Sequence, residues 1–280
     1  MKLEEGYFPS FDGTKIFFRT WTQPSQDNLL LIHGYGDHSG RYSELIKQLS
    51  KLPISFFAFD LRGQGKSKGR RVDANSFNDY VHDGSAYLEF LTKEGKIKGG
   101  KFFLLGHSLG GLIAVDLYKQ TPNQWKAILL SSPCFELYGV AWSPLARFLT
   151  DKLSRLTPHL VMSNLVKPRF LFHDQKKMEE YLKDPLIEKR ITCRLAHFIV
   201  EACLKAQKEK LEANIPLCVL AAGDERIVSL EATKNWFHHA QAVSKWIKIY
   251  PNLYHEIFNE IHTEEPAQDL LQFLSTHIAR

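Results

Sequence analysis

Short apolar runs alternate with longer amphipathic segments along most of the 280 residues, and this alternation constrains the fold more than any other feature. Each run is short and almost wholly apolar, which is typical of a strand buried on both faces of a parallel sheet. The runs are 29–32, 54–59, 102–105, 127–130, 217–220 and 246–250. The segments with helical periodicity are 42–52, 77–93, 112–120, 230–239 and 267–278. The order predicts an α/β fold with a mostly parallel central sheet and helices on both faces.

The pattern changes at both ends of this series. Residues 8–21, with a turn at Asp12-Gly13, predict an opening hairpin. About eighty residues between the runs 127–130 and 217–220 are predicted to be helical, without a strand. We expect residues 137–206 to form a helical cap inserted after the sixth strand, at the carboxyl edge of the sheet. Residues 1–136 and 207–280 would form the core of a single domain.

The first part of the expected cap, residues 137–156, has apolar side chains at roughly helical spacing. One interpretation is a helix packed on the core, and the other is an apolar lid that lines an acyl pocket or touches a lipid surface. The side chains concerned are Tyr138, Val140, Ala141, Trp142, Leu145, Phe148, Leu149 and Leu153.

The composition excludes few classes of protein. Residues 1–6 carry charges and no apolar run, unlike a signal peptide, and no stretch approaches the ~18 apolar residues of a membrane-spanning helix. The four cysteines lack C-x-x-C spacing, so we expect free, mostly buried thiols rather than a zinc site or a disulfide framework. We therefore expect a cytoplasmic protein that holds no metal.

The basic charge of the chain is concentrated in the expected cap. The net charge is +5, and residues 137–206 contain twelve Lys or Arg against seven Asp or Glu. This excess is typical of a solvated helix face, and the alternative is contact with anionic lipid headgroups at a membrane surface. No basic groove with interleaved aromatic residues or known binding motif accompanies it, so we expect no nucleic-acid partner.

Ser108 lies at the centre of a G-x-S-x-G motif, Gly106-His107-Ser108-Leu109-Gly110. An apolar run precedes the motif and a helix-like stretch follows it, which is the setting of a nucleophile elbow. A serine hydroxyl is a weak nucleophile, so it must be held on a tight turn within reach of a base. The sequence therefore predicts Ser108 as a catalytic nucleophile rather than part of a structural turn.

Two partners are needed to activate this serine. In enzymes with such an elbow, the acid and the histidine follow the serine along the chain, each in a loop after a late strand. His255 lies in such a loop, directly after the run 246–250. The run 217–220 leads into two adjacent carboxylates, Asp224 and Glu225. Either could fix the histidine tautomer and stabilise the imidazolium.

Several stretches beyond the elbow resemble the monoacylglycerol lipase and lysophospholipase group of α/β-hydrolases. The most specific are H-G-x-G-x-H-S-G-R-Y at 33–42 and D-x-R-G-x-G-x-S at 60–67. The similarity extends to 106–111, 184–186 and 254–256 and covers nearly the whole chain, but it is loose over the cap. The resemblance implies the α/β-hydrolase fold, and we expect Asp60 and Arg62 to hold loops beside the site.

The resemblance also bears on the choice of acid. In this family the acid usually stands nine residues after a strand-opening proline and just before an Arg-hydrophobic-hydrophobic triplet. Pro216 and the triplet at 226–228 both select Glu225 by these counts. The commoner residue in the family is Asp, so Asp224 stays an alternative.

An oxyanion hole is implied as well, formed by the backbone amides of Tyr35 and Leu109. Two aligned N–H groups would stabilise the negative oxygen of a tetrahedral intermediate. Family members often have a small residue where Tyr35 stands, so its side chain could narrow or reshape the mouth of the pocket.

We interpret the chain as a serine ester hydrolase that works through an acyl-enzyme and needs no cofactor or metal. By resemblance the substrate is a single-chain lipid, a monoacylglycerol or a lysophospholipid, and the basic cap favours the lysophospholipid. The alternatives are a short-chain carboxylesterase, a proline-type aminopeptidase and a non-hydrolysing receptor for a small ligand. An aminopeptidase would need an acidic anchor, for which Glu179, Glu180 and Glu201 are candidates. The sequence does not indicate an oligomeric state.

Overall fold

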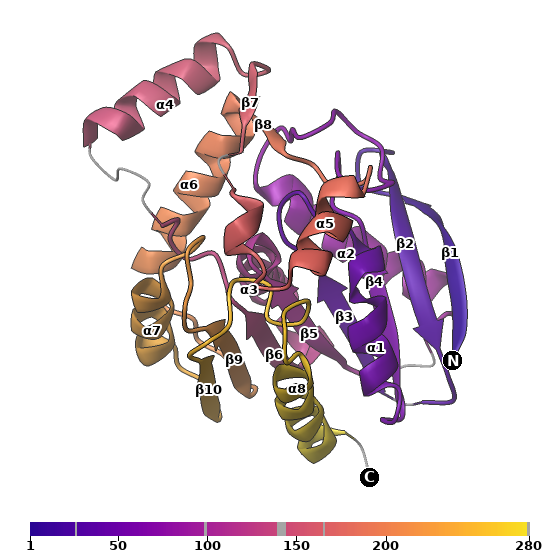
Figure 1. The fold of residues 1–280 in the computed structure, drawn as a ribbon. Helices are drawn as coiled ribbons and strands as arrows, with labels where there is room; N and C mark the ends of the chain where they lie inside the picture. Colours follow the sequence, from indigo (N-terminus) through magenta and orange to yellow (C-terminus); the bar gives the residue numbers. More distant parts are fainter. Residues whose placement is uncertain (26, 98–99, 139–143, 165, 279–280) are drawn as a thin grey trace.

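The computed structural model describes residues 1–25, 27–97, 100–138, 144–164 and 166–278. Within them an eight-stranded sheet has the order β1-β2-β4-β3-β5-β6-β9-β10, with helices on both faces (Figure 1). Pairs from β4 to β10 are parallel, whereas β1 pairs antiparallel with β2, and β2 with β4. The α/β fold and the opening hairpin are confirmed. The strands are β1 (Lys2–Pro9), β2 (Lys15–Thr22), β3 (Asp27–Ile32), β4 (Ile54–Phe59), β5 (Phe102–His107), β6 (Trp125–Ser131), β9 (Leu217–Ala222) and β10 (Lys245–Tyr250).

Two apolar cores form, one on each face of the sheet. In β3, Leu29 and Leu31 belong to one core, and Leu30 and Ile32 belong to the other. Because successive side chains of a strand point to opposite faces, a strand covered on both sides is apolar over most of its length. The first core receives α1 (Ser43–Leu49) and α8 (Glu264–His277); the second receives α2 (Asn78–Lys93), α3 (Leu109–Gln120), α6 (Cys193–Lys208) and α7 (Leu230–His239).

The insertion between β6 and β9 contains a small ribbon that the sequence did not predict. Its elements before α6 are α4 (Pro144–Leu156), β7 (Val161–Ser163), a 3-10 turn (Pro168–Phe170), α5 (Gln175–Lys183) and β8 (Arg190–Thr192). β7 and β8 pair antiparallel. The prediction of a purely helical insertion is therefore wrong, because strands of three residues are too short to show an alternating pattern.

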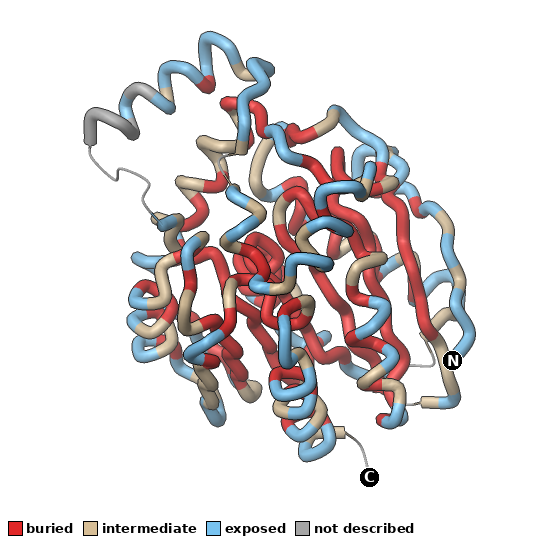
Figure 2. The backbone as a smooth tube through the Cα atoms, viewed as in Figure 1, coloured by how far each residue is buried: buried red, intermediate tan, exposed pale blue. Residues whose placement is uncertain are grey.

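Helix α4 lies at the outer margin of the molecule, away from the sheet (Figure 1). Its described residues are largely exposed (Figure 2), and Phe148 and Leu156 are 56% and 80% exposed. These two side chains do not pack on the core. The side chains of Leu145 and Leu149, which both interpretations also concern, lie outside those described, so the two interpretations stay predictions. Val140, Ala141 and Trp142 lie outside the described residues. No helix of the described ranges has the length and apolar character needed to cross a membrane.

The cysteines are buried free thiols, as the sequence predicts. Sγ of Cys134 and Sγ of Cys203 lie 3.9 Å apart, far beyond the ~2.05 Å of a disulfide bond. Cys203 lies in α6 and donates to the carbonyl oxygen of Cys134 at 3.0 Å, so the pair joins the insertion to the loop after β6.

Candidate active site

Ser108 occupies a sharp turn between β5 and α3. Its φ of 53° and ψ of −118° lie where residues with a side chain are rarely found, a strain that occurs at nucleophile elbows. Glycines are required beside it: a Cβ on Gly106 would collide with the carbonyl oxygen of Gly110, and a Cβ on Gly110 with that of Ile32. The amide of Ser108 donates to the carbonyl of Ser131 at 2.9 Å. The turn thus fixes the backbone that carries the hydroxyl.

Ser108, His255 and Glu225 form a continuous chain of hydrogen bonds. Nε2 of His255 lies 2.9 Å from Oγ of Ser108, and its Nδ1 lies 2.7 Å from Oε2 of Glu225. Glu225 follows β9 and His255 follows β10, so three parallel strands deliver the three side chains to one edge of the sheet. All three residues are at most 9% exposed. This is the geometry of a serine, a base and an acid that orients the base.

The structure brings Glu225, and not Asp224, to the histidine. The carboxylate of Asp224 accepts from the guanidinium of Arg226 at 2.6 and 2.7 Å and is about one-third exposed. It therefore behaves as a surface carboxylate, although it is the immediate neighbour of Glu225.

The second carboxylate oxygen of Glu225 is held by its own loop. Oε1 accepts from the amides of Arg226 (2.9 Å), Ile227 (2.8 Å) and Val228 (3.3 Å). The longer side chain of a glutamate can curl back to these amides and still reach His255 with Oε2. The two oxygens therefore have separate partners, and the carboxylate is held in one orientation between its own loop and His255.

His255 is more basic than a histidine in water. Burial disfavours its charged form, but the charge and hydrogen bond of Glu225, together with the charge of Glu256, outweigh burial and raise its pKa. A raised pKa is useful to a general base that must take the serine proton and then hold it.

His107, which lies beside His255, stays neutral. Its ring centroid is 5.0 Å from that of His255. Burial and then the charge of His255 lower the pKa of His107 to about 3. Of these two neighbouring imidazoles, His255 can therefore carry a charge, whereas His107 remains neutral and packs against it.

The oxyanion loop, defined as residues 33–38, follows β3 and lies against the elbow. A Cβ on Gly34 would be 3.2 Å from Cβ of Ser108, so the loop backbone passes close to the nucleophile. Leu109 opens α3, and the first amides of a helix have no acceptor within it. Leu109 directly follows Ser108, and Tyr35 directly follows Gly34, so both predicted donors to an oxyanion belong to segments that adjoin the nucleophile.

The side chain of Tyr35 reaches the insertion. Its hydroxyl donates to the carbonyl of Arg190, at the start of β8, at 2.5 Å. The next residue is held on both sides: Gly36 N donates to Oε1 of Gln64 at 2.7 Å, and Gly36 O accepts from the amide of Glu188 at 2.9 Å. The oxyanion loop is therefore fixed between the core and the insertion.

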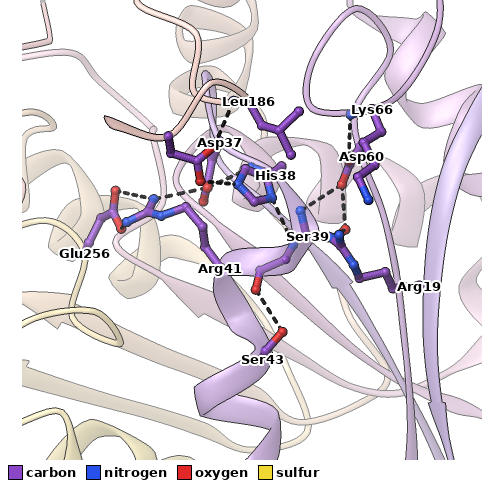
Figure 3. Close-up of polar contacts among 12 residues, drawn as sticks. Arg19, Asp37, His38, Ser39, Arg41, Ser43, Asp60, Lys66, Leu186 and Glu256 are labelled. Carbon is purple, nitrogen blue, oxygen red and sulfur yellow. Dashed lines mark hydrogen bonds and ion pairs between the residues drawn. The ribbon is translucent and has the colours of Figure 1, made fainter. Parts of the chain in front are cut away.

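Asp60 and Arg62 hold loops, as expected from the second motif. Oδ1 of Asp60 accepts from the amide of Ser39 at 2.8 Å and Oδ2 from the amide of Lys66 at 2.8 Å (Figure 3). Arg62 donates twice to Asp83, at 2.6 and 2.7 Å. Asp60 thus fixes Ser39, the residue that directly follows the oxyanion loop.

Arg41 and Glu256 were not singled out from the sequence. Arg41 donates to both carboxylate oxygens of Glu256, the residue after His255, at 2.9 and 2.5 Å (Figure 3). The sequence signal that could have identified them is their position in two motifs of the family resemblance, 33–42 for Arg41 and 254–256 for Glu256. Their pairing spans 215 positions of sequence, which no local pattern reveals.

The described residues contain no group of three or more His, Cys, Asp and Glu side chains that could hold a metal ion.

The family model Hydrolase_4, described as serine aminopeptidase, S33, matches residues 23–262. The chain belongs to this family. A relative with similar length is the monoacylglycerol lipase of Mycolicibacterium smegmatis, 24% identical over 98% of each chain. The monoglyceride lipase homolog of monkeypox virus is 29% identical over 96% of each chain. The crystal structure of the Paleococcus ferrophilus monoacylglycerol lipase superposes with a TM-score of 0.83 at 28% identity, covering 94% of this chain and 99% of that one.

This member of Hydrolase_4 spans less than half the length of two other curated relatives. It covers 46% of the uncharacterized Escherichia coli protein YnbC and 28% of an uncharacterized abhydrolase domain-containing protein of Dictyostelium discoideum. The shared region in both therefore corresponds to the α/β-hydrolase unit described above.

Proposed function

We propose that this Hydrolase_4 member is a serine hydrolase that cleaves carboxylic esters of single-chain lipids through an acyl-enzyme. The observation that carries the proposal is the hydrogen-bonded chain from Ser108 through His255 to Glu225 on a strained elbow. The names of the relatives, monoacylglycerol and monoglyceride lipases, support the choice of lipid substrate.

The reaction has two halves. His255 takes the proton of Ser108 as its oxygen attacks the ester carbonyl, and the amides of Tyr35 and Leu109 stabilise the resulting oxyanion. Collapse of the intermediate breaks the ester bond, and His255 gives the proton to the departing alcohol. Water, deprotonated by the same histidine, then releases the fatty acid and restores the serine.

We further propose that residues 137–206 act as a cap over the acyl chain and touch membrane surfaces. Support comes from its excess of basic residues and from a series of exposed apolar side chains. In this proposal a cytoplasmic enzyme meets its substrate at a bilayer. The basic cap favours lysophospholipid, which has an anionic or zwitterionic headgroup, over monoacylglycerol, which has an uncharged one. The exposed side chains are Tyr138, Phe148, Leu153, Leu156, Leu160, Val161, Met162 and Leu182.

The family description makes an aminopeptidase the second candidate. To bind the amine of a peptide substrate, the site would need a carboxylate that is not already paired with a Lys or Arg side chain. Glu179 and Glu180 pair with Lys183 and Lys177 at the surface of α5. Glu188, near the oxyanion loop, already has two arginine partners. These pairings favour the esterase; Glu201, the third candidate anchor, lies in α6 and is half-buried.

The deciding experiment is steady-state hydrolysis of p-nitrophenyl esters with acyl chains of two to sixteen carbons, beside a monoacylglycerol, a lysophosphatidylcholine and a proline p-nitroanilide. We expect fast multiple turnover on medium or long acyl chains, and its loss in Ser108→Ala. Activity confined to the shortest esters would indicate a general esterase, and cleavage of the anilide alone an aminopeptidase. No turnover on any substrate would favour a receptor.

A further inference from the structure

Arg41 lies between the oxyanion loop and the histidine loop, defined as residues 251–260. Its Nη1 donates to Oδ1 of Asp37 at 3.1 Å, and its two terminal nitrogens grip Glu256 at 2.9 and 2.5 Å (Figure 3). Planar, bidentate pairing of this kind fixes direction as well as distance. Because Glu256 is bonded directly to His255 along the chain, its position constrains the imidazole.

The same guanidinium also contacts the insertion. Its central carbon lies 5.4 Å from the ring centroid of Phe172 and 5.1 Å from that of Tyr181. A guanidinium within ~6 Å of an aromatic face is attracted to the ring. The two rings belong to a small apolar cluster of the insertion, which thereby covers Arg41 and leaves its side chain 13% exposed.

The part of the insertion around these rings, residues 171–190, is called the brace here, because it contacts both loops directly. On the histidine loop, the amide of Glu256 donates to the carbonyl of Leu171 at 3.3 Å, and the amide of His173 donates to Glu260 at 2.8 Å. Arg41 therefore lies inside a junction rather than at an exposed surface.

The brace reaches the oxyanion loop at its other end. Nε2 of His38 lies 2.9 Å from Oδ2 of Asp184, and the amide of Glu188 donates to Gly36. Asp184 belongs to one of the motifs quoted above, and His38 to another. Three segments distant in sequence thus meet around one cation.

The charges in this junction depend on that cation. Asp37 and Glu256 are 4% and 6% exposed, and Oδ2 of Asp37 has no hydrogen-bond partner among the described residues. Burial would raise the pKa of Asp37, but the charge of Arg41, together with His33, His38 and the hydrogen bond from the His38 amide, outweighs burial and lowers that pKa. For Glu256 burial prevails and its pKa is raised despite Arg41. Without the guanidinium, two buried carboxylates would repel one another, and the loops that carry them would separate.

We propose that Arg41 is a positioning residue, which sets the separation of the oxyanion and histidine loops and thereby the alignment of His255 with Ser108. The inference rests on the proposed function. In this proposal the brace is a fixed part of the catalytic arrangement, and Arg41 does not contact the reacting atoms. Its effect should therefore appear in the chemical step and not in substrate binding.

The test compares Arg41→Met, which keeps apolar length against the rings, with Arg41→Lys, which keeps the charge but cannot grip Glu256 with two nitrogens. We expect Arg41→Met to lower kcat about 10²-fold with little change in KM, as a small misplacement of reacting groups can do. Arg41→Lys should recover part of this loss. The control is Arg194→Met, which removes a bidentate pair with Asp73 at 2.7 and 3.1 Å between the insertion and the core. Its kcat should stay near that of the wild type.

A second readout is the rate at which a fluorophosphonate labels Ser108, followed by intact mass. Because the reagent needs no lipid pocket, the rate reports alignment of the serine and its base directly. Arg41 variants should lose labelling rate in parallel with kcat. If the wild type is labelled but hydrolyses no lipid ester, the proposed substrate class fails while the role of Arg41 is still measured. A wild type inert to both would overturn both proposals.

The double variant Arg41→Met/Glu256→Gln separates positioning from loss of fold. If Arg41 acts through Glu256, neutralising the unpaired carboxylate should make the double variant no slower than Arg41→Met alone. Additive losses, a loss confined to KM, or a wild-type kcat in Arg41→Met would each overturn the proposal. Should Arg41→Met fail to fold by circular dichroism, Arg41→Lys and Glu256→Gln decide by the same kcat and labelling criteria.

Discussion

Glu225 divides its carboxylate between His255 and its own loop: Oε2 lies 2.7 Å from Nδ1 of His255, and Oε1 accepts from three successive amides. One side chain therefore fixes both the tautomer of the histidine and the shape of the loop that carries the acid. An aspartate on the same backbone would be one methylene shorter and would have to give up one of these sets of contacts.

We expect Glu225→Gln to be far more damaging than Asp224→Asn. The amide nitrogen of a glutamine can face the ring and stabilise the wrong tautomer, so kcat should fall on the order of 10³-fold or more. Asp224 pairs only with the exposed Arg226 among the described contacts, and its variant should keep most activity. Steady-state kinetics on one ester with both variants measures the ranking, and the reverse order would remove Glu225 from the triad.

The acidic limb of the kcat profile should lie above the ordinary histidine pKa of about 6.5. Catalysis needs neutral His255, whose pKa is raised mainly by Glu225 against the opposing effect of burial. Activity should therefore fall as the pH drops through that raised value. Glu256→Gln removes another charge that raises the pKa of His255 and should move the limb to lower pH. Asp224→Asn is the control, and an equal shift in both variants would contradict the assignment.

The same raised pKa links protonation of His255 to stability. Its contribution to the free energy of unfolding is complete below the pKa of the unfolded chain and is lost as the pH rises through the folded-state pKa. The stability difference between wild type and His255→Gln, from urea unfolding, should therefore shrink as the pH rises across this interval. A difference that grows with pH would show that the folded-state pKa is not raised.

Tyr35→Phe should lower kcat by less than about tenfold, because it removes one hydrogen bond to the carbonyl of Arg190 and keeps the backbone amide. Tyr7→Phe is a matched control, since Tyr7 also donates its hydroxyl to a backbone carbonyl, that of Lys66, but on the outer hairpin. Comparison of kcat for the two variants isolates the link to the insertion. Equal values would mean that this link does not support the oxyanion loop.

Phe148→Asp/Leu156→Asp should weaken binding to vesicles that contain phosphatidylglycerol by about tenfold or more, because each exposed apolar side chain would otherwise enter the bilayer. Hydrolysis of soluble p-nitrophenyl butyrate should stay at the wild-type rate. Val243→Asp serves as the control in the same vesicle-sedimentation assay, because Val243 is also apolar and 72% exposed but lies outside the insertion. Unchanged vesicle binding would argue against a membrane role for α4.

The sequence predicts the sheet well because its signal is local. The central strands after the hairpin are covered on both faces, so their apolar runs stand out, as 54–59 does in β4, whereas β10 at the edge of the sheet is only partly buried. The elbow is local too, since strand, glycines and helix adjoin Ser108. The histidine could be placed because it follows a strand whose end is visible in the sequence. The end of another strand limited the acid to Asp224 or Glu225, and the family resemblance selected Glu225.

The contacts that join the insertion to the site could not be predicted in this way. β7 and β8 are three residues each, below the length at which alternation is seen. The hydroxyl of Tyr35 meets the carbonyl of Arg190 across 155 positions, and Arg41 meets Glu256 across 215. Such pairs depend on how the chain returns to the sheet edge, which periodicity does not encode.

The brace has a consequence for how activity would be lost on heating. It contacts both catalytic loops, whereas the sheet is stabilised by two large apolar cores that do not depend on it. Local unfolding of such a segment costs less free energy than melting of the whole domain. Inactivation would then precede global denaturation. Local unfolding of residues 171–190, which hydrogen exchange would report, would set the working temperature limit of the enzyme, and the Tm would not.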